Sequence, residues 1–259
     1  DFNSKSSIHH RYSHMRKLPE LQNLLHACPH YAIWDDHDFG PNDSDRSFIH
    51  KEWTEEAFEM FWGNNGFGLP GMPGITGQFT YADVDVFLLD NRYFRCPQDV
   101  QNENRSILGD SQTEWLIEAL KYSRAPFKLV AVGGQFLSDM ADYENHANYP
   151  EERDYILKRL NDEGIEGVIF LTGDRHHTEL SKLTLPNGHD VYDLTCSPLT
   201  SGYYDHSDEK NTHRVKGTIV GQRNFATLTF EGPRKERTLE IKVFAVDGEE
   251  LWRHLITNN

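Results

Sequence analysis

Four short apolar runs, each followed directly by polar side chains, constrain the fold of this sequence more than any other feature. The runs are YAIW at 31–34, VFLL at 86–89, LVAV at 129–132 and VIFL at 168–171. Each has the length and apolar character of a buried strand, and helical patterns lie between them. Strands that alternate with helices indicate an α/β domain built on a central sheet.

The rest of the chain completes this picture. Helices are predicted at 20–27 after Pro19, at 45–62 with capping candidates Asp43, Ser44 and Asp45, at 111–123 with Ser111 as cap, and at 149–164 with Gly164 as stop. Residues 78–92 predict a hairpin that turns near Ala82 and Asp83, whereas 1–19 look extended. Three alternating segments between 225 and 256 predict antiparallel strands. We therefore expect one domain over residues 1–259, an α/β fold with a strand-rich C-terminal part.

Composition excludes several classes of partner. The formal net charge of −15 argues against a nucleic-acid scaffold role or an anionic membrane surface as partner. No apolar run approaches the roughly 20 residues that a membrane-spanning helix needs. The three cysteines are widely spaced and form no C-x-x-C pair, so a zinc ribbon is not indicated.

The polar clusters that follow the four runs predict a shared site, because ligands of α/β sheets bind beyond the carboxyl ends of the strands. Asp36 and His37 follow the first run, and Asp174 and His176 follow the fourth. Carboxylate and imidazole groups suit Zn, Mn, Fe, Mg or Ca, and closely packed carboxylates repel one another without cations. Two such cations can clamp a phosphoryl group.

Plainer interpretations exist for several of these residues. Asp43 to Asp45 are well explained as helix caps, and the GDRHH segment at 173–177 can be a tight polar turn. Arg92 and Arg175 can hold phosphate oxygens bidentately or can form ordinary ion pairs. The glycine-rich loop at 63–77 is either a wall over the site or a structural loop.

A set of motifs resembles one known family. The motifs are IWDDHD, LLDNRYFR, LGDSQTEWL, GGQF, YPEERDYIL and FLTGDRHH, in that order. They resemble the alkaline phosphatase D, or PhoD-like, branch of the calcineurin-like metallophosphoesterases over roughly residues 19–202. The resemblance implies a four-layer α/β/β/α sandwich with a dinuclear metal site at the strand ends. It also implies hydrolysis of phosphomonoesters and often phosphodiesters, in a periplasmic or secreted protein.

The resemblance also implies roles for single residues. Asp36, Asp174 and His176 take the places of metal ligands, and Asp38 and Asn42 are neighbours that could join them. His37 takes the place of the histidine that stabilises the transition state or protonates the leaving oxygen. Gln135 takes the place of a ligating histidine and is a candidate substrate contact. Arg92 and Arg175, which can hold phosphate oxygens, are the other candidate substrate contacts and candidate catalytic residues.

The sequence departs from the family pattern at its start. The G-S-C and G-D-x-x-Y motifs, which supply ligands of the first metal, do not occur in it. The resemblance thus implies a PhoD-like domain without its N-terminal part, with two or more Fe, Ca, Zn or Mn ions only partly bound. The partners implied are a phosphate-ester substrate and either the missing N-terminal part or a second copy, docked on an exposed strand edge or apolar face. A catalytically incomplete binding or scaffold module is the alternative to an active phosphohydrolase.

Overall fold

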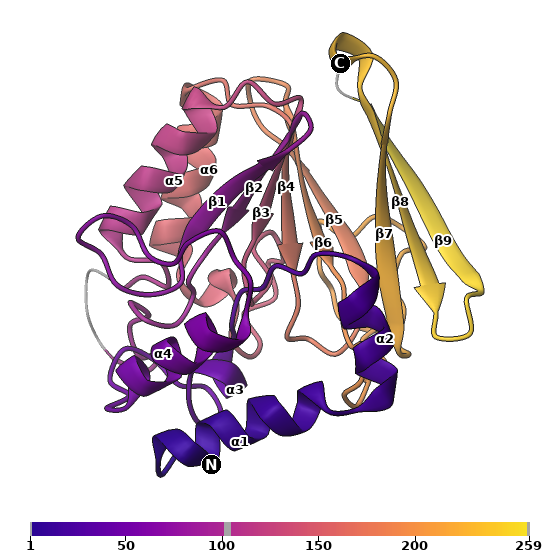
Figure 1. Cartoon of the computed structure of the whole chain (residues 1–259). Coiled ribbons are helices and arrows are strands. Elements are labelled where there is room, and N and C mark those ends of the chain that lie inside the picture. Colours follow the sequence, from indigo (N-terminus) through magenta and orange to yellow (C-terminus); the bar gives the residue numbers. More distant parts are fainter. Residues whose placement is uncertain (1, 101–104, 258–259) are drawn as a thin grey trace.

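Two stacked β-sheets form the centre of the molecule, and two helices cover the outer face of the larger sheet (Figure 1). This computed structural model describes residues 2–100 and 105–257. The larger sheet contains, in spatial order, β1 (Gly77–Tyr81), β2 (Val84–Leu88), β3 (Phe127–Ala131), β4 (Val168–Thr172), β6 (Asp190–Thr195) and β5 (Glu179–Thr184). Strands β2, β3, β4 and β6 are parallel, and antiparallel β1 and β5 close the two edges. The carboxyl ends of four strands therefore meet at one edge of the sheet.

The helical layer consists of α5 (Asp110–Tyr122) and α6 (Pro150–Asp162). Alternate residues of the parallel strands point toward it, and Phe87, Val130 and Phe170 pack with the apolar stripes of both helices. A connection from one parallel strand to the next needs a crossover, and these helices supply it while burying the sheet face. The predicted alternation of strands and helices is confirmed for this region.

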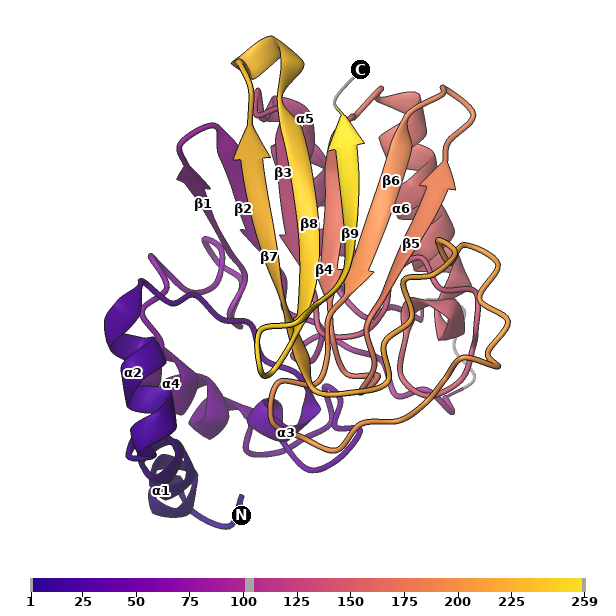
Figure 2. The same cartoon turned by 90° about the vertical axis from the view of Figure 1, so that its right-hand side faces the viewer.

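The second sheet is antiparallel and lies on the opposite face of the first (Figure 2). It consists of β7 (Asn224–Glu231), β8 (Thr238–Ala245) and β9 (Glu250–Thr257), with the short helix η2 (Arg234–Glu236) between β7 and β8. Leu239 and Ile241 of β8 pack against Leu129 and Ile169 of the central sheet. The mixed α/β fold with a strand-rich C-terminal part is therefore confirmed.

The outer face of the second sheet is polar. On it Lys242 and Arg253 form ion pairs with Glu240 at 2.8 and 3.5 Å. No helix in the described part of the chain covers this face (Figure 2). Residues 2–100 and 105–257 thus form three of the four expected layers, and the outer face carries charges suited to water rather than to a further apolar layer.

The predicted strand at 30–35 is wrong. These residues pair with no strand in the described part of the chain, and the short helix α3 (Asp36–Phe39) follows them. Trp34 is fully buried against Phe39 and Phe58, and the side-chain amide of Asn64 both accepts from and donates to the backbone of Ala32, at 2.9 and 2.8 Å. Aromatic packing and one asparagine thus replace a sheet ladder here.

Residues 1–19 were expected to be extended, and the part that the structure describes, residues 2–19, is not. The helix α1 (Lys5–Arg16) occupies most of them, and Ser4 caps it by accepting a hydrogen bond from the Ser7 backbone at 3.2 Å. The helix packs on α4 (Lys51–Phe61), with the rings of Tyr12 and Phe61 stacked at 4.9 Å. Helix α2 (Pro19–Ala27) follows as predicted. No helix in the described ranges is long and apolar enough to cross a membrane.

Two predicted helix starts are also wrong. Helix α4 begins at Lys51 with His50 as its cap, because Asp45 instead accepts from the backbone of Ser47 in a local turn. Helix α5 is capped at Gly109 rather than by Ser111. The carboxylate of Glu152 on α6 accepts hydrogen bonds from the backbone N–H groups of three residues before α5. This tertiary contact thus satisfies backbone N–H groups before α5, as a local capping side chain would.

Candidate active site

The carboxyl ends of β3, β4 and β6 open into a pocket of about 860 Å³, beside α3 at the lower end of the sheet in Figure 1. The segments that follow these three strands line it together with the α3 region. Its lining residues are Asp35, Asp36, His37, Asn42, Asp43, Tyr143, Glu144, Asp174, Arg175, His176, Ser197, Pro198, Leu199, Thr200, Ser201, Tyr204 and His206. Two of the four predicted polar clusters, those after YAIW and VIFL, therefore meet at this pocket. The segment after β3 contributes Tyr143 and Glu144 from farther along the chain, and the end of β6 adds a further segment.

One wall of the pocket is a cluster of three carboxylates. Asp36, Asp43 and Glu144 each offer an oxygen atom, and these atoms lie within 4.8 Å of one another. The two oxygens of Asp36 accept hydrogen bonds from the backbone of His37 at 2.7 Å and of Asp43 at 3.1 Å, which fixes the direction of the carboxylate. Burial and the nearby charge of Glu144 raise the pKa of Asp43. The cluster therefore holds more negative charge than its own surroundings neutralise.

A buried arginine stands behind this cluster. The guanidinium of Arg92 is completely buried and donates to Asp35 at 2.6 Å and, with two nitrogens, to Glu144 at 2.7 and 2.9 Å. Arg95 adds a contact to Glu144 at 3.0 Å. Burial alone would raise the pKa of Glu144, but Arg92 and Arg95 hold it below its ordinary value. Burial alone would lower the pKa of Arg92, but Asp35 and Glu144 raise it.

The turn after β4 adds the side chains of Asp174 and His176 to the polar groups that border the pocket. Burial, followed by the negative charges of Asp35, Glu144 and Asp36, raises the pKa of the Asp174 carboxyl to about 7. A carboxyl group held so far above its usual pKa marks a place where a cation would relieve repulsion.

Backbone strain is concentrated at this pocket. Five residues other than glycine have a positive φ in the described ranges. Ala82 sits in the β1–β2 turn, and the other four line the pocket: Asp43 at 60°, Tyr143 at 60°, Asp174 at 67° and His176 at 55°. Residues other than glycine adopt a positive φ only at a steric cost, and residues with such a strained backbone gather at functional sites.

Close packing also fixes the turn after β3. A Cβ atom on Gly133 would lie 2.3 Å from the amide nitrogen of Asn91 and 2.6 Å from the carboxyl carbon of Asp35. Asn91 donates to Asp35 at 2.8 Å, while its side-chain oxygen is buried without a hydrogen-bond partner. Only glycine fits between β3 and this pair, and the side-chain oxygen of Asn91 is a buried hydrogen-bond acceptor without a partner.

The predicted site residues divide into two groups. Those that border the pocket are Asp36, His37, Asn42, Asp174, Arg175 and His176. Arg92 lies behind the pocket wall, and Gln135 is buried in contact with Glu179 and Thr195. Asp38 borders a neighbouring groove instead. The side chain of Arg175 is only 1% exposed, because Glu209 binds it.

Sequence reasoning missed Asp43, Tyr143, Glu144 and the entire segment after β6 that lines the pocket, and it left one loop undecided. Asp43 was explained as a helix cap, and Tyr143 and Glu144 lie in a polar segment with no recognisable motif. The glycine-rich loop at 63–77 does not border the pocket, and it packs Phe67 on Phe58 instead. The structure thus favours the structural interpretation of this loop.

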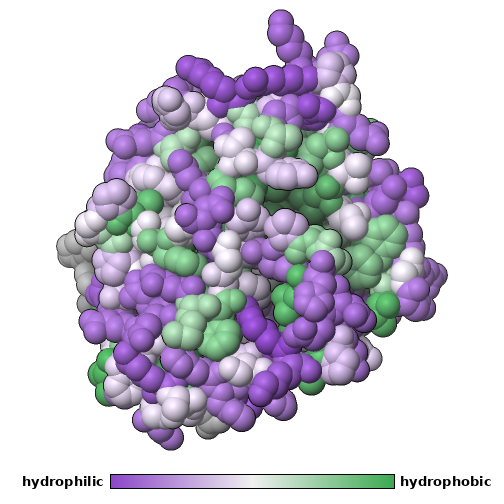
Figure 3. Space-filling view, in the orientation of Figure 1, coloured by the Kyte–Doolittle hydropathy of each residue, from purple (hydrophilic) through white to green (hydrophobic). Residues whose placement is uncertain are grey.

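An apolar groove of about 430 Å³ adjoins the acidic pocket and shares Asp35 and Asp174 with it. It lies between the two sheets, where Leu171 and Leu228 line opposite sides. Figure 3 shows a largely hydrophilic surface with apolar residues gathered in a hollow. The groove is an apolar face of the kind that the resemblance implies, and its occupant stays a prediction.

Comparison with known proteins agrees with this architecture. Residues 72–239, well over half of the chain, match the family described as PhoD-like phosphatase. The chain belongs to this family. It is 24% identical over 206 residues to alkaline phosphatase D of Bacillus subtilis (strain 168), which covers 67% of this chain and 35% of that protein. A solved structure of PhoD shares the fold with a TM-score of 0.64 at 18% identity, over 86% of this chain and 51% of that one.

The chain therefore spans about a third of the length of the curated relative and half of the solved one. Membership in the PhoD-like family confirms the resemblance seen in the sequence. Proteins of this family use metal ions, and the pocket fits such ions on its own evidence. Its donors are carboxylate, imidazole and amide groups, and the oxygen of Asn91 has no partner. Burial, followed by the charges of Asp35, Glu144 and Asp36, also raises the pKa of Asp174.

Proposed function

We propose that this chain is a metal-dependent phosphohydrolase that cleaves phosphomonoesters, phosphodiesters or both. The observation that carries the proposal is the meeting of five carboxyl groups at the carboxyl ends of parallel strands, around a pocket whose arginines are bonded to carboxylates. Such a pocket cannot attract a phosphate ester by itself, because its own charge is negative. With cations bound, the sign of the local field is reversed.

Asp36, Asp43 and Glu144 would hold one cation, because their oxygens already lie within reach of a common point. Asp174, His176 and Asn42, which also border the pocket, are the proposed ligands of another. Cations of this kind, among them Fe, Ca, Zn and Mn, neutralise phosphoryl oxygens and acidify water when bound.

The protein's own groups have separate tasks in this scheme. The imidazole of His37 is 73% exposed at the pocket and lies 3.7 Å from Asp36, where it can give a proton to the leaving oxygen. Arg92 and Arg175 are buried, so we propose that they position carboxylates and loops and do not touch the substrate. Gln135 shares this positioning task through its hydrogen bond to Glu179.

The test is turnover of p-nitrophenyl phosphate and of bis-p-nitrophenyl phosphate with added Mn²⁺, Zn²⁺, Fe³⁺ or Ca²⁺. The unaltered chain should hydrolyse at least one of them in a metal-dependent way. Asp36→Asn should abolish the metal dependence, and Asp83→Asn, at an ion pair with Arg237 remote from the pocket, should not. Equal activity of the two variants would contradict the assignment of the pocket.

The binding of both Arg92 and Arg175 to carboxylates favours a second candidate, a cation-binding module with no turnover of its own. Isothermal titration with Mn²⁺ separates the two. Cation binding that depends on Asp36, without hydrolysis of either ester, would support the module and reject the phosphohydrolase.

A further inference from the structure

The turn at 173–177 combines residues that border the pocket with buried side chains. Asp174, Arg175 and His176 border the pocket, and the side chains of Arg175 and His177 are buried. Asp174 and His176 have positive φ values, of 67° and 55°. Local sequence does not favour this conformation, so neighbouring structure must impose it. The contacts of Arg175 and His177 show what imposes it.

Arg175 is held from three directions. One guanidinium nitrogen is hydrogen-bonded to Glu209, another approaches the side-chain oxygen of Gln135 at 3.5 Å, and the ring of Tyr143 lies 4.8 Å from the guanidinium carbon. Glu209 in turn contacts the ring of His206 at 2.7 Å. The arginine therefore connects the turn to the segment after β3 and to the segment after β6.

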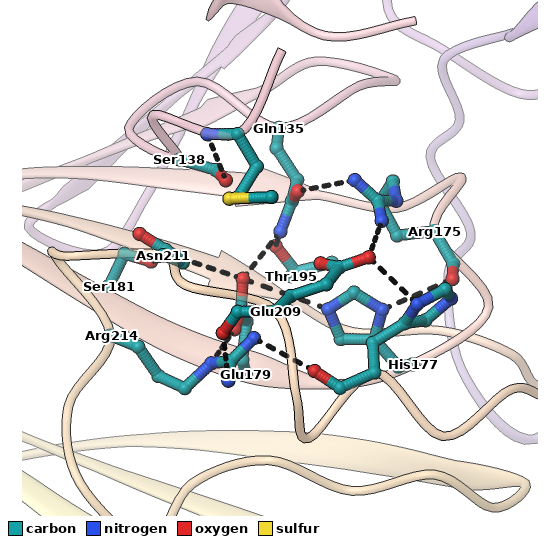
Figure 4. A network of polar contacts seen from close by, with 12 residues as sticks. Gln135, Ser138, Arg175, His177, Glu179, Ser181, Thr195, Glu209, Asn211 and Arg214 are labelled. Carbon is teal, nitrogen blue, oxygen red and sulfur yellow. Dashed lines mark hydrogen bonds and ion pairs between the residues drawn. The ribbon is translucent and has the colours of Figure 1, made fainter. Parts of the chain in front are cut away.

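His177 is held by a second buried carboxylate. Its ring lies 3.7 Å from Glu179 of β5, and its other nitrogen is 3.1 Å from the carbonyl of Arg175. Glu179 also accepts from Gln135 at 2.8 Å and from Asn211 at 2.9 Å. Although burial acts in the opposite direction, His177 and Arg214 lower the pKa of Glu179 to about 2. Figure 4 shows this network of carboxylates between the turn and the segment at 205–214.

From this geometry we infer that Glu209 is a positioning residue for the pocket. It does not line the pocket, yet it fixes Arg175 and so holds Asp174 and His176 in their strained, inward-facing conformation. The inference rests on the proposed function, because its consequence is tighter cation binding. Residues that orient ligands without touching the metal commonly change metal affinity by about 10- to 100-fold.

Glu209 acts on a second contact of the same turn. The backbone N–H of Tyr204 donates to the carbonyl of His176 at 3.1 Å, and the rings of the two residues stack at 5.5 Å. Tyr204 lies five residues before Glu209 in the same segment. Release of Glu209 from Arg175 should loosen this contact, because the segment loses its charged anchor to the turn.

The experiment compares Glu209→Gln with Glu209→Asp and with Asp83→Asn as the matched control. Asp83 and Glu209 are similarly shielded, with 21% and 12% of the side chain exposed, and each is hydrogen-bonded to one arginine. Titration calorimetry with Mn²⁺ alone should show affinity about 10-fold weaker in Glu209→Gln, near normal in Glu209→Asp and unchanged in Asp83→Asn. Thermal unfolding should show similar losses for Glu209→Gln and Asp83→Asn.

Hydrogen exchange at the Tyr204 amide gives a readout that needs no cation. It should be about tenfold faster in Glu209→Gln than in Asp83→Asn. If the unaltered chain binds no Mn²⁺, the proposed function fails, and the exchange rates alone decide the role of Glu209. Equal exchange in the two variants, or equal Mn²⁺ affinity where binding occurs, would overturn the inference.

Discussion

Two turns at the carboxyl edge of the sheet each bury an arginine, and they use it differently. After β2, Arg92 bonds to Asp35 and Glu144, which themselves line the pocket. After β4, Arg175 bonds to Glu209, which does not. The first arginine thus reduces the charge of the pocket, whereas the second ties separate segments together. Residues of one type, at similar places in the fold, can set the electrostatics of a site or its shape.

Arg92→Met should cause the largest loss of stability and would test the electrostatic half of this comparison. Removing the guanidinium leaves Asp35 without its counterion and Glu144 with Arg95 alone, and loss of one partner of a buried ion pair costs about 3–5 kcal/mol. Urea unfolding of the metal-free protein measures it. A loss no greater than that of Arg175→Met would show that the two arginines are equivalent.

Arg175→Met should destabilise less, by about 1–3 kcal/mol, because it removes charge-assisted hydrogen bonds but leaves Glu209 partly exposed to water. Combined with Glu209→Gln, its effect should be clearly less than additive, since both variants break the same contact. The measurement is a double-mutant cycle by urea unfolding. Additive losses would mean that the two side chains act on stability independently.

Much of this arrangement was predictable from the sequence. VFLL, LVAV and VIFL formed strands because continuous apolar runs of that length suit a sheet that is buried on both faces. YAIW failed, because the packing of Trp34 and the amide of Asn64 satisfy the segment without a ladder. Strands β5 and β6, with their polar residues Lys182 and Asp190, gave too weak an apolar signal to be noticed.

The site was predictable only in part. Asp36, Asp174 and His176 were found because they directly follow strands or resemble a family motif. Glu144 was not, because only the folded loop brings it to Arg92. The sequence does not distinguish an arginine that binds a phosphate ligand from one that pairs with a buried carboxylate. Which of the two roles the arginine takes depends on residues that are distant in the chain.

The two turns should also differ in how pH affects cation binding. The pKa of Asp174 is raised to about 7, so in the metal-free protein its contribution to stability is present at low pH and is lost as the pH rises through 7. The pKa of Glu144 is lowered, so the carboxylate of Glu144 stays ionised between pH 5.5 and pH 8. Added Mn²⁺ should therefore raise the melting temperature more at pH 8 than at pH 5.5. Asp174→Asn should remove most of this difference, and an unchanged pH dependence would assign the titration to another group.

The smallest effect concerns strain, which is present in the turn after β4 and in the segment after β3 that packs on it, and which the turn after β2 lacks. Tyr143 covers Arg175 with its ring while its own φ is 60°. Tyr143→Ala loses the ring contact, worth about 0.5–1 kcal/mol, and keeps the strained backbone. Tyr143→Gly loses the same contact but relieves a left-handed conformation that costs about 1–2 kcal/mol. The glycine variant should therefore be the more stable of the two in urea unfolding, whereas the reverse order would show that the loop imposes no strain on Tyr143.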